Sequence, residues 1–150
     1  MTRRSPRPRS AYTGFMTIPT RWNDNDLYGH VYQGTYIELF DCAVNDWLVR
    51  ENGIDLHTGD PTIVVVENTI SYFREVSYPD RVEVGFRLES LGGASLRLGL
   101  GMFREGGDEE CAQMASVLVN VTKDDHRPQP WSDTHRAMWQ RLEVAEKTGG

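Results

Sequence analysis

Cysteine and long apolar runs are both scarce in this sequence of 150 residues. Its two cysteines, Cys42 and Cys111, are too few for a disulfide framework and form no Cys-x-x-Cys metal or redox motif. This cysteine usage is typical of a reducing compartment, so we expect a cytoplasmic protein. No apolar run approaches the roughly 18 residues that a membrane-spanning helix needs. The sequence therefore predicts a soluble protein without a membrane partner.

Positive charge is scarce outside the first ten residues. The net charge is −6, and residues 1–10 hold four arginines and no acid, so removing their charge of +4 leaves −10 for residues 11–150. An acidic body argues against nucleic-acid binding, which needs a basic surface to meet phosphates. With its two prolines and two serines, the basic segment predicts a disordered tail over residues 1–12, followed by a single domain over residues 13–150.

Two kinds of motif are absent from the sequence. No serine lies in a Gly-x-Ser-x-Gly sequence, which argues against the chemistry of serine hydrolases. The histidines show no spacing typical of metal ligands, so the sequence predicts no metal site, and we expect no cofactor. The histidines are His30, His57, His126 and His135.

A long amphipathic helix is the clearest element that the sequence predicts. From Thr35 to about residue 50, apolar side chains recur at spacings of three and four residues. Thr35 and Glu38 fit a capping box at its start, and Gly53 follows its end as a stop signal. The apolar face is wide, which indicates a helix buried against a sheet.

Strand-like patterns account for most of the remaining sequence. A first strand is expected within residues 15–22, at a sheet edge, because Pro19 cannot donate a ladder hydrogen bond. Another is expected within residues 61–73, and alternating apolar residues joined by short turns predict a three-stranded antiparallel meander over residues 82–121. A short C-terminal helix, with Asp133 as its N-cap, completes the pattern. The predicted fold class is therefore α+β, with five antiparallel strands covering one long helix.

The segment between the first strand and the helix carries the densest set of chemically active residues. It contains two carboxylates, Asp24 and Asp26, then a glycine turn at Gly29 and the imidazole of His30. Because the first N–H groups of a helix are exposed, they can polarise a carbonyl while a nearby carboxylate attacks it or activates water. Structural roles are the alternative: Asp24 can form a salt bridge with Arg21, and His30 can shape the loop by hydrogen bonding.

This segment resembles the motif of a known family. The pattern Trp22-x-Asp24-x-Asp26-x-x-Gly29-His30-Val31 is similar to that of the 4-hydroxybenzoyl-CoA thioesterase-like family. Weaker similarities cover three further segments, residues 73–80, 91–96 and 127–130. The resemblance implies the hotdog fold, in which a five-stranded antiparallel sheet wraps around one long central helix. It also implies hydrolysis of a thioester as the activity.

The resemblance assigns roles to individual residues. Asp26 takes the position of the family's catalytic carboxylate, which acts as nucleophile or as general base, and the backbone amide of Gln33 takes that of the group polarising the thioester carbonyl. Gly29, His30 and Tyr32 are expected to form the substrate-binding part of the site. Family members work as homodimers or homotetramers with active sites between subunits, so the same assembly is expected here.

Two departures from the family leave the substrate open. Gln33 stands where the family often has Asn or Tyr, which can change the acyl group that fits. The turn at residues 92–94 lacks the basic residues that in some members hold the phosphates of coenzyme A. Both an acyl-CoA and an acyl carrier protein therefore stay open as the thioester substrate.

Two other functions rival this thioesterase activity. A hotdog hydratase or dehydratase needs a catalytic histidine–acid pair along the helix, and the absence of histidine from residues 35–50 argues against it. A non-catalytic acyl-CoA binding or sensor protein would keep the fold without turnover. An acyl-CoA thioesterase is the favoured function.

Overall fold

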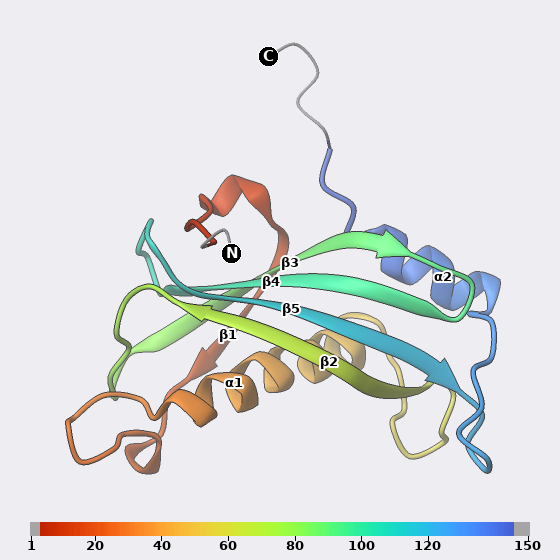
Figure 1. Ribbon diagram of the computed structural model, residues 1–150, viewed down its shortest axis with the longest axis horizontal. Coiled ribbons are helices and arrows are strands. Elements are labelled where there is room, and N and C mark those ends of the chain that lie inside the picture. The colour runs from red at the N-terminus through yellow and green to blue at the C-terminus, as the bar shows by residue number, and fades with distance from the viewer. Residues whose placement is uncertain (1–3, 146–150) are drawn as a thin grey trace.

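The computed structural model describes residues 4–145, so that residues 1–3 of the predicted tail and 146–150 of the predicted domain lie outside it. Five strands form one antiparallel sheet with the order β1-β3-β4-β5-β2, and α1 lies along one of its faces (Figure 1). The strands are β1 (Thr13–Pro19), β2 (Thr62–Tyr72), β3 (Arg81–Leu91), β4 (Ser95–Arg104) and β5 (Glu110–Val121), and the helices are α1 (Gln33–Asp46) and α2 (Asp133–Gln140). The predicted α+β class is confirmed, and the strand that ends in proline lies at a sheet edge as predicted. No helix within residues 4–145 is long and apolar enough to cross a membrane.

The core lies between α1 and the sheet. Alternate side chains of β3 and β4 face the helix, and the helix buries residues at three- and four-residue spacing in return. The buried residues of α1 are Tyr36, Leu39, Phe40 and Ala43. A π-helical turn over Trp47–Glu51 extends α1, and Gly53 then leaves the helix with a φ of 64°, a conformation that favours glycine.

The helix begins two residues earlier than predicted. Gln33 is its first residue and Tyr32 is its N-cap, whose side chain makes no capping hydrogen bond within residues 4–145. The predicted capping box of Thr35 and Glu38 is therefore wrong, because Thr35 already lies within the first turn. The cause is the fold of the preceding loop, in which the N–H of Tyr32 donates to the carbonyl of Asp24 at 2.8 Å and fixes where the helix starts.

The N-terminal segment lies on the face of the sheet opposite α1 (Figure 1). The guanidinium of Arg9 pairs with Glu83 of β3 at 2.8 Å, and the buried Tyr12 donates its hydroxyl to the carboxylate of Glu110 on β5. Arg9 and Tyr12, both within the predicted tail, therefore contact the sheet. Arg7 and Arg9, which suggested a solvated tail, pair with acids of the sheet, Glu89 and Glu83.

The C-terminal helix closes the core beyond the end of α1. Its N-cap is Ser132 and not the predicted Asp133, since the Ser132 hydroxyl oxygen accepts the N–H of His135 at 3.1 Å. Trp139 of α2 is fully buried, and its ring centroid lies 5.2 Å from that of Trp47. The contact joins α2 to the π-helical turn after α1, at the end of the core away from the loop before α1.

Candidate active site

The loop before α1 is folded around the carboxylate of Asp26. Its Oδ1 accepts the backbone N–H of Tyr28 at 2.8 Å and that of His30 at 3.5 Å. The N–H of Asp26 donates to the His30 carbonyl at 2.8 Å, and Gly29 turns the chain between them with a φ of 80°, as the sequence predicted. Among the described residues, both hydrogen bonds to this carboxylate use Oδ1, which leaves Oδ2 available to a ligand.

The other acid of the loop, Asp24, is structural. Its side chain is only 1% exposed, and its Oδ2 accepts the backbone N–H of Arg21 at 2.6 Å. The Arg21 guanidinium lies 2.8 Å from the second carboxylate oxygen, Oδ1. The predicted salt bridge is confirmed, and an acid so enclosed cannot reach a substrate. The loop therefore presents Asp26 alone of its two acids.

Gln33 places its backbone N–H at the start of α1. As the first helical residue it has no carbonyl one turn earlier in the helix to accept this N–H, and no hydrogen bond among residues 4–145 uses it as donor. The neighbouring chain is held rigidly: Val31 donates its N–H to the Val76 carbonyl at 2.7 Å, and Val76 donates its own to the Tyr36 hydroxyl at 3.1 Å. A fixed, unpaired N–H at a helix N-terminus is a preorganised donor for an anion or a polarised carbonyl.

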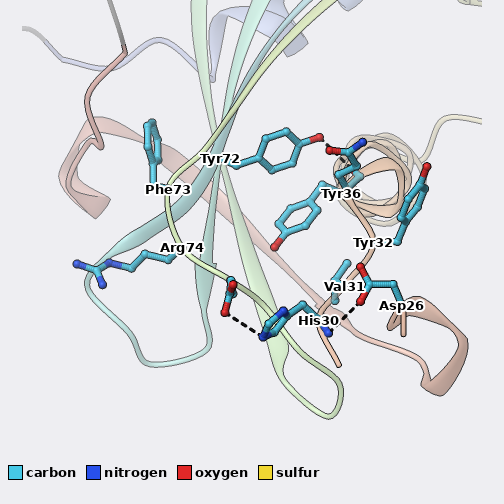
Figure 2. Close-up of a pocket in the computed structure, with 10 residues that line it drawn as sticks. Asp26, His30, Val31, Tyr32, Tyr36, Tyr72, Phe73 and Arg74 are labelled. Atoms are coloured by element: carbon cyan, nitrogen blue, oxygen red, sulfur yellow. Dashed lines mark hydrogen bonds and ion pairs between the residues drawn. The ribbon is translucent and has the colours of Figure 1, made fainter. Parts of the chain in front are cut away.

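An open cavity of about 380 Å³ joins these groups (Figure 2). Its walls come from the loop before α1, the first turn of α1 and the chain at the end of β2. Of the predicted site residues, Asp26, His30, Tyr32 and Gln33 line it, whereas Gly29 lies in the turn of the loop. The remaining lining residues are Val31, Tyr36, Tyr72, Phe73, Arg74 and Glu75.

Tyr72 and Glu75 are among the lining residues that were not predicted from the sequence as site residues. The Tyr72 hydroxyl donates to the carbonyl of Gln33 at 2.9 Å, although the two residues lie 39 positions apart. The carboxylate of Glu75 lies 2.9 Å from Nε2 of His30 (Figure 2). In the sequence, their one distinguishing feature is their position at or just after the end of a predicted strand. The pairing of β2 in the sheet is what brings them to the loop.

Two tyrosine hydroxyls of the cavity are neutral at neutral pH. Burial raises the pKa of Tyr36 and, with a smaller contribution from Tyr32, the pKa of Tyr72. Tyr72 therefore serves as a hydrogen-bond donor and Tyr36 as an acceptor, and neither supplies a negative charge. Within the described part of the chain, no cluster of three or more His, Cys, Asp or Glu side chains is placed to hold a metal ion.

The sequence matches one protein family over most of its length. The family is described as the thioesterase-like superfamily, and the match covers residues 20–138. This range contains the loop, α1 and four of the five strands. No curated protein shows a significant match to the chain.

Several solved structures resemble the chain over nearly their full lengths. The PA5185 protein of Pseudomonas aeruginosa is 36% identical over 95% of this chain and 100% of its own, with a TM-score of 0.90. The PA2801 protein of the same organism, provisionally described as a thioesterase, is 30% identical over 83% of this chain and 95% of its own, with a TM-score of 0.77. A Thermus thermophilus thioesterase complexed with coenzyme A and zinc is 27% identical over 88% of this chain and 95% of its own, with a TM-score of 0.73.

Proposed function

The chain belongs to the thioesterase-like superfamily and has the hotdog fold, and from this premise we propose that it is an acyl-CoA thioesterase. The reaction is hydrolysis of a thioester to a carboxylic acid and a free thiol. One observation carries the proposal: the Asp26 carboxylate and the first helical residue, Gln33, line the same cavity. The Thermus thermophilus thioesterase with bound coenzyme A supports the choice of thiol carrier.

In the proposed reaction, the N–H of Gln33 donates to the thioester carbonyl oxygen. This oxygen becomes negatively charged as the carbonyl is attacked, and the positive end of the α1 dipole adds to its stabilisation. The loss of one such donor in other enzymes costs about 2.7–4 kcal/mol of transition-state stabilisation. Because the donor is the backbone N–H, it does not depend on the side chain. Glutamine at this position can therefore serve as well as the Asn or Tyr that the family often has there.

Asp26 supplies the negative group that starts the reaction. It either attacks the carbonyl and forms an anhydride that water then hydrolyses, or it removes a proton from the attacking water. Both routes use a carboxylate oxygen that is free in the resting site, which is Oδ2. Both end in the same carboxylic acid and thiol.

His30 and Tyr32 complete the substrate-binding part of the site, with Gly29 shaping the loop that carries them. The Nε2 of His30 lies 2.9 Å from the carboxylate of Glu75, and both residues line the cavity. Tyr32, as the N-cap of α1, lines the cavity next to Gln33. These contacts favour a role in shaping the cavity for His30 over direct chemistry.

We expect His30→Ala to lower kcat/KM by about tenfold at most. The substitution removes the pair with Glu75 but keeps the backbone N–H that Asp26 accepts, and one hydrogen bond of about 0.5–1.5 kcal/mol corresponds to roughly a tenfold factor or less. Thiol release from a good acyl-CoA substrate is the measurement. Glu75→Gln is the matched variant and should act in the same direction with a smaller effect. A loss of about 10²-fold or more in His30→Ala would instead place its imidazole in proton transfer.

A second copy of the chain is the proposed partner, as a homodimer or homotetramer with active sites between subunits. The sheet order leaves β2 as an edge strand, and its Val65 and Val66 are 49% and 59% exposed. An exposed strand edge with apolar side chains is a template for pairing with another strand. The same strand ends at Tyr72 in the cavity, so pairing there would bring a second subunit close to the site. A monomer in sedimentation equilibrium would contradict this assembly.

A thiol-release screen tests the proposed function. Short-chain, long-chain and aryl thioesters of coenzyme A are compared with the same acyl groups on an acyl carrier protein. We expect turnover of at least one acyl-CoA and slower release from the carrier protein, because the charge of −10 on residues 11–150 repels an acidic partner. Faster release from the carrier protein would reassign the substrate. Binding of acyl-CoA without any release would favour a sensor.

A further inference from the structure

The side chain of Tyr72 spans the space between the sheet and the central helix. Tyr72 is the last residue of β2, and its hydroxyl donates to the carbonyl of Gln33, the first residue of α1, at 2.9 Å. Its ring stands edge-on against that of Tyr36, with the ring centroids 5.1 Å apart. Both tyrosines therefore lie at one end of the gap between β2 and α1 (Figure 2).

A largely apolar groove lies further along α1 and β2. It has a volume of about 370 Å³ and runs between α1 and the inner face of β2 and β5. Its apolar walls are formed by Ile37, Val44, Val65 and Leu118. The two carboxylates that line it, Glu38 and Asp41, are exposed. A second hollow of about 230 Å³ shares Val44, Val65 and Leu118 with it and leads further along α1, away from the catalytic cavity.

The pairing of the strands places Tyr72 at the junction of cavity and groove. The groove includes Met114 of β5, whose partner on β2 is Ile70. The next residue of β2 on the same face is Tyr72, two positions on, which is about 6.8 Å further along the strand. On the helix, Gln33 lines the cavity and its neighbour Gly34 lines the groove. The bridge from Tyr72 to Gln33 therefore stands between the two spaces.

We propose that Tyr72 is the residue that limits the length of the acyl group, so that the substrates are compact short-chain or aryl thioesters. With the ring in place, the acyl group is confined to the catalytic cavity, whose lining includes Tyr32, Tyr36 and Phe73. Without the ring, the cavity opens into the groove between α1 and β2, and a long acyl chain can lie along the apolar residues there. The inference deepens the proposed function and rests on it.

The test compares three proteins over a series of acyl-CoA substrates from acetyl to palmitoyl, with benzoyl-CoA included. For the wild type, kcat/KM should peak at a compact acyl group and fall for longer chains. For Tyr72→Ala, it should rise along the series by up to about fourfold per methylene, the factor that corresponds to roughly 0.8 kcal/mol per buried CH₂. Tyr72→Phe loses the hydroxyl but keeps the ring, so it should keep the wild-type preference for length.

A length preference of Tyr72→Ala that parallels the wild type would overturn the proposal, as would a gain for long chains in Tyr72→Phe. Binding of non-hydrolysable alkyl thioethers of coenzyme A gives a second measurement that needs no turnover. The affinity of the wild type should stop rising once the alkyl group outgrows the catalytic cavity. A steady rise with every methylene would overturn the length limit even if Tyr72→Ala failed to fold. If the thioethers bind with this length limit but no substrate releases its thiol, the proposed hydrolysis is rejected and the length limit stands.

Discussion

Asp26→Asn is expected to lower thioester hydrolysis by about 10²–10⁴-fold, the usual contribution of a positioned acid–base group. The asparagine carbonyl can accept the same N–H groups, from Tyr28 and His30, so the loop should keep its conformation. What the variant lacks is the negative oxygen that attacks the thioester or takes a proton from water. The loss should therefore appear in kcat/KM on the best acyl-CoA substrate, with the unfolding free energy and oligomeric state unchanged.

Asp55→Asn is the matched control for this substitution. Asp55 also accepts the N–H of the residue two positions on, His57 at 2.9 Å, but it lies in an exposed loop outside the cavity. Its substitution should leave the rate at the wild-type level. Wild-type turnover by Asp26→Asn would refute a catalytic role for Asp26. Its carboxylate would then have only a structural role in the turn, like that of Asp55.

Gly101→Ala is expected to destabilise the fold by about 1–3 kcal/mol or more, the usual cost of overpacking a core. A Cβ at this position of β4 would overlap both the ring of Tyr12 and the carboxylate of Glu110. Glu110 is buried and accepts hydrogen bonds from the hydroxyl of Tyr12 and from the side chain of Gln113 at 2.7 Å. Burial and the bond to Glu110 raise the pKa of Tyr12 well above its usual value, so this donor is never lost to ionisation at neutral pH. Urea unfolding monitored by tryptophan fluorescence measures the change.

Gly93→Ala is the control for this effect. Gly93 lies in the turn between β3 and β4, and a Cβ there would meet no atom of residues 4–145 within 4 Å. Its substitution should change the unfolding free energy by less than about 0.5 kcal/mol, as is usual for surface positions. Equal stability of Gly101→Ala and Gly93→Ala would mean that the N-terminal segment is not packed on the sheet as described.

Features with a local period were predictable from the sequence, because the period follows directly from strand or helix geometry. The alternation of Val82, Val84 and Phe86 predicted a strand with one buried face, and these residues are fully buried in β3. The spacing of Tyr36 and Phe40 predicted the buried face of α1 in the same way. The loop motif also singled out Asp26 and Gln33, and both line one cavity.

Features that depend on contacts between distant residues were not predictable from local pattern. The helix start follows from a hydrogen bond between Tyr32 and the Asp24 carbonyl, for which the side-chain types give no sign. Tyr72 reaches the site only through the register of β2 with β5. The ordered N-terminal segment depends on Gly101, whose missing side chain makes room for Tyr12 only once β3, β4 and β5 are paired.

Product analysis by mass spectrometry gives the most direct measurement of whether the protein is a thioesterase. The purified protein is incubated with an excess of its best acyl-CoA, or of an unsaturated acyl-CoA, and the products are weighed. Hydrolysis by Asp26 and the Gln33 amide predicts the free carboxylic acid and free coenzyme A in equal amounts, in many turnovers per subunit. An acyl-CoA that gains the mass of water with its thioester intact, or that stays bound and unchanged, would contradict it.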